Sequence, residues 1–187
     1  MITIGARELN KVVKQLGSLK AEAPGAINRA LNRTAQAART EAARAVKDNY
    51  FVKVGDAKKT MKIIRGTKQR LGAFVLSKGN LVPLDQYKVK PKTIRSGSKQ
   101  PKRKVAVSKG KAPSLVPGAF MAEINGPKLF QRVGKARLPI SRLMGPAIPQ
   151  LVDNEDVLSA VDKVVMATYE KRIDHEIGRI LDKKGGK

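Results

Sequence analysis

The chain has 187 residues, of which 39 are Lys or Arg and 15 are Asp or Glu, so its formal net charge at pH 7 is +24. It contains no cysteine, which excludes disulfides, thiolate nucleophiles and cysteine-ligated zinc. This charge predicts a polyanionic partner: nucleic acid first, then an anionic membrane or an acidic protein. The N-terminus has no signal-peptide architecture, and no run approaches the ~20 apolar residues of a membrane span. We therefore expect a soluble protein, made and used in a cytoplasm.

A chain of this length can bury one good core, so we expect a single domain of residues 1–187, with a helical part at 6–48. Apolar residues at three- and four-residue spacing predict a first helix from Ala6 to Glu22, ended by Pro24-Gly25. A second, Ala-rich helix follows, from Pro24 or Gly25 to Asp48. Its polar side carries four basic residues that we interpret as solvated surface rather than a nucleic-acid contact: Arg29, Arg33, Arg44 and Lys47.

Residues 49–87 predict short strands. The segments from Met61 to Arg65 and from Leu71 to Ser77 favour a meander, joined by a polar connection. The heptapeptide LVPLDQY at 81–87 is typical of a short edge strand or a turn.

Residues 88–114 are rich in Lys, Pro, Ser and Gly, and we expect them to form a long flexible loop before a strand candidate at Val105 to Val107. Residues 57–122 hold 17 basic residues and only one acidic residue, Asp85, so the positive charge is concentrated here. Such a segment neutralises phosphates and gives salt-sensitive affinity without sequence preference. The candidate nucleic-acid contacts are Lys88, Lys90, Lys92, Arg95, Lys99, Lys102, Arg103, Lys104, Lys109 and Lys111.

Two features limit this hypothesis. Only Tyr87 flanks the segment and the chain has no Trp, so bases have no aromatic platform on which to stack. Zinc-finger spacing and a convincing recognition helix are both missing from the sequence. The alternative is a solvated loop that only aids solubility.

A hairpin is expected at residues 115–134. The segment from Phe120 to Ile124 leads into Asn125-Gly126, which tolerates the positive φ of a tight turn, and Lys128 to Val133 returns. Residues 135–152 hold three prolines and should run as an extended, turn-rich arm. Its apolar side chains need a cover, which makes them candidate subunit contacts: Leu138, Ile140, Leu143, Met144 and Ile148.

The last predicted helix, residues 153–183, begins with Asp153 or Asn154 as a cap and carries a continuous apolar stripe. About 29 residues make a helix roughly 43 Å long, more than a small core covers. Its second half either packs on a neighbouring subunit or lies along its own sheet. The candidate subunit contacts there are Tyr169, Ile173, Ile177, Ile180 and Leu181.

Catalytic chemistry is hard to find in this sequence. His175 is the only histidine and stands between Asp174 and Glu176, without partners for a metal site. The adjacent Glu155 and Asp156 suit the positive end of a helix. No phosphate-cradling or nucleophile motif appears. We predict no enzyme, no cofactor, no catalytic residue and no metal site.

The order of these parts resembles the minor tail protein Z family of tailed bacteriophages and prophages. The resemblance rests on ALNRTAQAARTEAARAV, NYFVKVGDAKKTMKI, LVPLDQY before a basic loop, GAFMAEI with its return LFQRVGKARLPISRLMGPAIPQLV, and a long last helix. It covers about Ala26 to Lys183. The order of parts and the phrase PISRLMGPAIPQ are its specific features.

The resemblance implies a structural virion protein at the head-proximal end of the tail, which acts in tail completion and head-to-tail joining and is assembled in the host cytoplasm. It implies a sixfold ring of copies that contacts other neck and tail proteins, such as a tail terminator and a head-tail connector, near the DNA in the lumen. It carries over no catalytic residues.

The residues themselves predict an α+β protein: a small, mostly antiparallel sheet with two N-terminal helices and one long C-terminal helix. The alternative function is a sequence-nonspecific nucleic-acid binder of the ribosomal or nucleoid type, which the charge alone favours. A membrane partner is not expected, because the helices carry mixed polar faces and no aromatic anchors.

Overall fold

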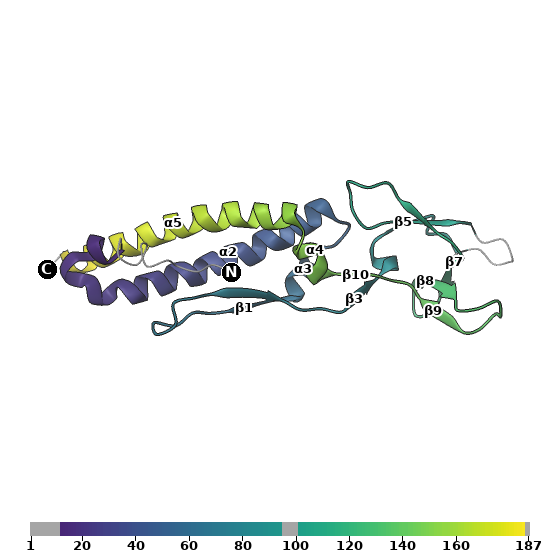
Figure 1. The fold of residues 1–187 in the computed structure, drawn as a ribbon, viewed down its shortest axis with the longest axis horizontal. Helices are drawn as coiled ribbons and strands as arrows, with labels where there is room; N and C mark the ends of the chain where they lie inside the picture. The colour runs from purple at the N-terminus through teal and green to yellow at the C-terminus, as the bar shows by residue number, and fades with distance from the viewer. Residues whose placement is uncertain (1–11, 95–100, 186–187) are drawn as a thin grey trace.

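Two long helices that run antiparallel to each other form one end of an elongated molecule, and most of the strands lie toward the other end (Figure 1). The computed structural model describes residues 12–94 and 101–185. The long helices are α2 (Ala23–Asn49) and α5 (Glu155–Gly185), which pack along each other. The α+β class predicted from the sequence is confirmed.

Helix α2 begins at Ala23, one residue before the start predicted at Pro24 or Gly25, so the second predicted helix is confirmed. Pro24 lies in its first turn, where the N–H that proline lacks has no helical partner in any case. The Ala-rich stripe then buries Ile27, Leu31 and Val46 completely. Because alanine side chains are so short, the backbone of α5 can approach closely along this stripe.

The first predicted helix is shorter than expected. Residues 12–16 are α-helical, but Gly17 has a φ of +53°, in the left-handed region that interrupts an α-helix. The chain continues as the 3-10 helix η1 (Gly17–Glu22). Residues 6–11 of the predicted helix lie outside the described residues.

Helix α5 has the cap that its sequence predicts. The Asn154 side chain accepts a hydrogen bond from the backbone N–H of Asp156 (3.0 Å), and the Asn154 carbonyl accepts one from Leu158 (2.9 Å). The short helix α4 (Ile148–Val152) precedes it, and α3 (Val54–Lys59) follows α2.

Among the described residues all strand pairs are antiparallel, but the strands form four small sheets rather than the single sheet that was expected. The 3-10 turn η2 (Leu84–Gln86) joins β3 to β4. The sheets are β1 (Met61–Ile64) with β2 (Phe74–Ser77); β3 (Leu81–Pro83) with β10 (Met144–Ala147); β4 (Lys88–Lys90), β5 (Arg103–Ala106) and β6 (Ser114–Val116); and β7 (Ala119–Glu123), β8 (Pro127–Arg132) and β9 (Ile140–Arg142).

The β7–β8 hairpin is confirmed. Asn125 and Gly126 have φ values of +52° and +92°, and Glu123 pairs with Pro127 at the start of the return strand. The predicted arm at 135–152 is more structured than expected, because β9 adds to β8 and β10 pairs with β3. Its end turns into α4, where the Gln150 side chain accepts a hydrogen bond from the Ala147 N–H (2.9 Å).

Within residues 12–94 and 101–185, the buried apolar residues form two clusters. One lies between the first half of α2 and the second half of α5, around Leu31 and Ile173. The other lies where the two helices meet the sheets, around Val46, Met61 and Leu129. The second cluster positions the lysine-bearing strands at the end of the molecule away from the first cluster.

Candidate polyanion and protein interfaces

Strands β4 and β5 place lysines on one face of their sheet and apolar residues on the other. In β4, Lys88 and Lys90 are exposed while Val89 between them is buried. In β5, Lys104 is exposed and Val105 is buried. Side chains alternate between faces along a strand. The alternation therefore turns part of a charge-rich segment into an ordered face of lysines.

The lysines of this face lie close to one another. Lys90 and Lys104 are directly opposite partners in the β4–β5 ladder. The Nζ atoms of Lys88 and Lys109 lie 4.7 Å and 5.9 Å from the ring centroid of Phe51, so both cations share one aromatic ring. Like charges directly opposite each other destabilise a sheet, and a polyanion relieves that repulsion.

We call these four lysines, together with the exposed Lys102 that directly precedes β5, the lysine face. The prediction of a long flexible loop is therefore wrong for the residues of β4 and β5. These residues form strands, in which the side chains of Val89 and Val105 are buried. Lys92 and Lys111 are exposed in the same segment. Arg95 and Lys99, also predicted as contacts, lie outside the described residues.

Arg103 was predicted to contact nucleic acid, but its side chain is fully buried. Its guanidinium donates hydrogen bonds to the carbonyl oxygens of Pro91 and Thr93, the latter at 2.9 Å. Burial lowers its pKa from the usual range. Arg103 thus fastens the segment after β4 to β5, and it is a structural residue rather than part of the lysine face.

Asp85, the single acidic residue of the basic window, is used inside the fold. Arg142 on β9 donates from Nε to Oδ1 (3.1 Å) and from Nη2 to Oδ2 (2.8 Å), and the Leu129 N–H of β8 also points to Oδ1 (3.4 Å). Burial raises the pKa of Asp85. The hydrogen bonds and the charge of Arg142 lower it by more than burial raises it, so the pKa of Asp85 lies below its usual value of 3.8. This pair holds the β7–β8–β9 sheet against η2, directly before the lysine face, and leaves the lysines without that carboxylate.

Tyr87 anchors the start of β4. Its buried hydroxyl donates a hydrogen bond to the Pro146 carbonyl on β10 (2.8 Å), and burial raises its pKa to about 12. Gly145 lets β10 approach this closely, because a Cβ there would lie 2.8 Å from Leu84 and 2.9 Å from Tyr87. The heptapeptide 81–87 therefore connects the start of β4, and with it the lysine face, to β10.

The predicted subunit contacts divide into buried and accessible residues. Tyr169, Ile173, Ile177 and Ile180 are buried within the chain, in the cluster that α5 forms with α2. Within the chain their stripe packs against α2, which is the cover that the sequence did not identify. Ile148 is also buried within the chain. A subunit contact stays a prediction for the exposed Leu138, Met144 and Leu181 and for the half-buried Ile140 and Leu143.

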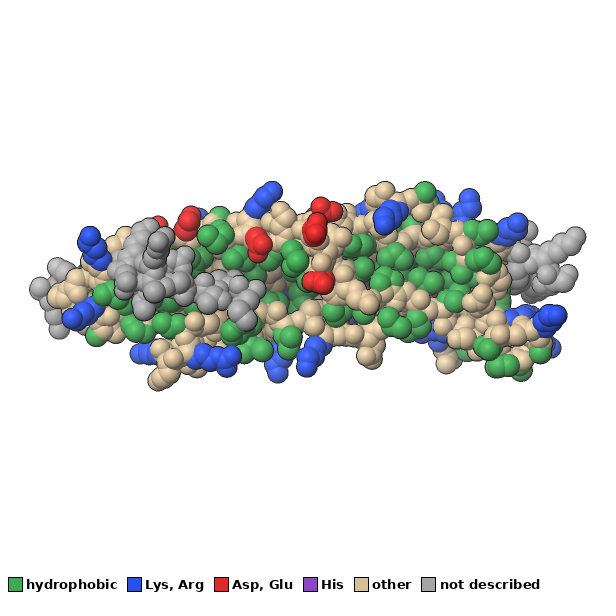
Figure 2. Space-filling view, viewed as in Figure 1, with side chains coloured by type: hydrophobic (Ala, Val, Ile, Leu, Met, Phe, Trp, Pro, Cys, Tyr) green, Lys and Arg blue, Asp and Glu red, His purple; other side chains and the backbone are tan. Residues whose placement is uncertain are grey.

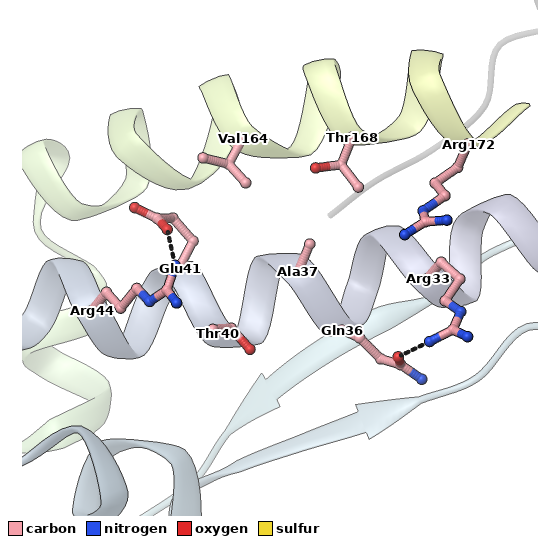
Figure 3. Close-up of a pocket in the computed structure, with 9 residues that line it drawn as sticks. All are labelled: Arg33, Gln36, Ala37, Thr40, Glu41, Arg44, Val164, Thr168 and Arg172. Carbon is pink, nitrogen blue, oxygen red and sulfur yellow. Dashed lines mark hydrogen bonds and ion pairs between the residues drawn. The ribbon is translucent and has the colours of Figure 1, made fainter. Parts of the chain in front are cut away.

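Sequence reasoning missed a groove between α2 and α5, which we call the arginine groove (Figure 3). The cavity measures about 360 Å³. Nine residues line it: Arg33, Gln36, Ala37, Thr40, Glu41, Arg44, Val164, Thr168 and Arg172. The basic side of α2 was visible in the sequence, but the contribution of Arg172 depends on how α5 lies beside α2.

The charges are unevenly distributed over the surface. On the face shown in Figure 2, the acidic side chains lie over the helical half and near the middle of the molecule, whereas Lys and Arg supply the charge at the end with β5 and β7. Within 12–94 and 101–185, no group of three or more His, Cys, Asp or Glu could hold a metal ion. No helix in those ranges is long and apolar enough to cross a membrane.

Comparison with known protein families gives a match over most of the chain. The model of the family described as prophage minor tail protein Z (GPZ) matches residues 7–184, nearly the whole chain. No curated protein and no solved structure matches it.

Proposed function

Because the chain belongs to the prophage minor tail protein Z family and is therefore a structural protein of a phage tail, we propose that it acts at the head-proximal end of the tail, in tail completion and head-to-tail joining. The family match over residues 7–184 carries this proposal.

In the virion, copies of the chain form a ring, sixfold in this proposal, and contact other neck and tail proteins such as a tail terminator and a head-tail connector. Assembly takes place in the host cytoplasm. The exposed Leu138, Met144 and Leu181 remain the candidate protein contacts of this proposal.

The lysine face contacts DNA in the lumen of the ring. Several lysines converge there, and none of them forms an ion pair within the described residues. The aromatic ring beside them, Phe51, already contacts Lys88 and Lys109 and so is not an open platform for bases. The contact is therefore made to phosphates, with affinity that falls steeply with salt.

The test is negative-stain microscopy of lysates from the parent phage with this gene disrupted. We expect separate filled heads and free tails, or joined particles that fail to deliver DNA. Complementation with the intact gene must restore infectious particles. Normal, infectious particles from the disrupted phage contradict a role in tail completion.

A second candidate is a sequence-nonspecific nucleic-acid binder of the ribosomal or nucleoid type, favoured by the net charge of +24 and the lysine face. It predicts tight, salt-dependent binding of the isolated chain to cellular nucleic acid, together with normal particles after gene disruption. This second candidate is contradicted if gene disruption blocks head-to-tail joining and a variant without nucleic-acid affinity restores joining.

A further inference from the structure

The arginine groove has basic side chains at both ends. Arg33 and Arg172 lie at one end, from α2 and α5 respectively, and Arg44 lies at the other (Figure 3). Arg33 and Arg44 are eleven positions apart on one helix, which is about 16 Å at 1.5 Å per residue. The groove therefore presents two positive ends separated by the length of about three helical turns.

These arginines are poorly neutralised by the chain itself. Arg33 donates to the neutral Gln36 side chain (3.3 Å), and the exposed Arg44 has the half-buried Glu41 at 3.9 Å, a long ion pair. Among the described residues, no carboxylate forms an ion pair with Arg33 or Arg172. The groove can thus accept carboxylates from outside.

The floor between the arginines consists of short side chains. Ala37 and Thr40 come from α2, Val164 and Thr168 come from α5, and all four are half-buried. Small residues facing one another across two helices leave room for a third element, and their methyl groups offer it an apolar contact. A third helix can pack into such a groove with a distance of roughly 8–10 Å between helix axes.

We propose that the arginine groove binds an amphipathic helix of a partner protein, with apolar residues toward the floor and carboxylates toward Arg33, Arg44 and Arg172. The guanidinium group favours this partner, because its planar donors match a carboxylate in two parallel hydrogen bonds. Acidic residues about eleven positions apart on the partner helix reach both ends of the groove.

Two other occupants fit less well. DNA satisfies the arginines, but its phosphate backbone makes no use of the apolar floor. A second copy of this chain has 39 basic residues against 15 acidic ones, so it offers the groove few carboxylates. The proposal is independent of DNA contact by the lysine face, because the two surfaces share no residue.

The probe is a fluorescein-labelled 16-residue helical peptide of Leu, Ala and Glu, with a Leu/Ala stripe and glutamates at positions 2 and 13. Its control carries Gln in place of each Glu. Titration of the full chain should show anisotropy-detected binding of the Glu peptide and at least tenfold weaker binding of the Gln peptide.

The groove variant is Arg33→Gln with Arg172→Gln. Its matched control is Lys47→Gln with Lys163→Gln, which removes the same charge from exposed positions of the same helices outside the groove. We expect the groove variant to weaken Glu-peptide binding at least tenfold and the control variant less than twofold. The charge-swapped variant Arg33→Glu with Arg172→Glu should instead bind a peptide with Lys in place of Glu. Circular dichroism of each variant checks the fold.

Equal losses in both Gln variants overturn the proposal, since they indicate net charge alone. Lack of binding by the Glu peptide also overturns it. So does a groove variant that loses affinity for a 20-base-pair duplex but keeps its affinity for the peptide, because the groove then binds DNA. Light scattering of the free chain addresses the remaining occupant: self-association that the groove variant abolishes assigns the groove to a second copy.

Discussion

At the helical end of the molecule, carboxylates of the same chain neutralise several arginines: Glu176 pairs with both Arg29 and Arg179, and Glu41 lies near Arg44. On the lysine face, the cations are lysines, and the nearby Asp85 is already paired with Arg142. The Arg29–Glu176–Arg179 cluster is therefore locally balanced, whereas Arg33 and Arg172 of the arginine groove have no ion-pair partner among the described residues. The helical end thus offers planar, bidentate donors, and the lysine face offers point charges.

This difference indicates two kinds of partner. Arginines select a partner by geometry, since their planar donors match a carboxylate in two parallel hydrogen bonds. Uncompensated lysines select by charge density and gain affinity mainly from counterion release. One basic chain can therefore separate protein contact from DNA contact by the chemistry of its cations as well as by their position.

The largest expected effect tests the lysine face directly. Log affinity for duplex DNA falls as log salt concentration rises. Replacing Lys90, Lys102 and Lys104 with Ala should make this negative slope less steep by about 2.7, at about 0.9 for each lost phosphate contact. The control replaces Lys47, Lys163 and Lys171, exposed lysines of the helical end, with Ala. Filter binding between 50 and 300 mM salt measures both slopes. If the two triple variants change the salt slope equally, the lysine face contacts DNA no more than the lysines of the helical end do.

Part of that distinction was accessible from the sequence. Periodicity predicted α2 and α5, and Asn125-Gly126 predicted the hairpin, because these signals are local. The burial of Arg103 could also have been predicted. Successive side chains of a strand point to opposite faces, so Arg103 lies on the same face as Val105 and Lys104 lies on the other. Reading residues 88–114 as a loop by composition hid this alternation.

Other features required contacts between distant segments. The pairing of β3 with β10 joins residues about sixty positions apart, and no local pattern specifies it. The arginine groove depends on the register of α5 against α2, which places Arg172 at the same end as Arg33. The buried stripe of α5 was predicted correctly, but an apolar stripe alone does not identify whether its cover is α2 or another subunit.

The second prediction concerns the carboxylate that the lysine face lacks. Asp85→Asn keeps the shape of the side chain but removes the charge that Arg142 contacts, and should lower the free energy of unfolding by about 2 kcal/mol. The surface pair Asp56–Lys59 is the control, and Asp56→Asn should have almost no effect. Urea denaturation at pH 7 compares the two variants.

The sign of the pH dependence follows from the same pair. The folded pKa of Asp85 lies below its usual value of 3.8, so its stabilising contribution is present above pH 4 and is lost as the pH falls through the folded pKa. The difference between the wild type and Asp85→Asn should therefore shrink below pH 4. A difference that stays constant between pH 7 and pH 3 contradicts the role of the ionised carboxylate.

A smaller effect is expected at Glu176, which balances the helical end. Glu176→Gln leaves Arg29 and Arg179 without their shared carboxylate, and because both arginines are partly exposed the loss should be about 1 kcal/mol. Added salt should stabilise this variant relative to the wild type, since it screens the new repulsion. Thermal denaturation in 0.05 and 0.5 M NaCl measures the difference, and an equal salt response in the two proteins contradicts internal charge balance.

The last prediction concerns the hydrogen bond that holds the start of β4, and so the lysine face, against β10. Tyr87→Phe removes the hydrogen bond to the Pro146 carbonyl and should cost about 1 kcal/mol at pH 7, whereas Tyr50→Phe serves as the control at a half-buried position. Burial raises the pKa of Tyr87 to about 12, so its contribution is complete below about pH 10, the usual value for tyrosine, and is lost as the pH rises through about 12. Denaturant titrations from pH 7 to 11 should therefore show a steeper alkaline loss of stability in the wild type than in Tyr87→Phe. Parallel pH profiles indicate that the hydroxyl ionises freely and that η2 and β10 hold the lysine face without it.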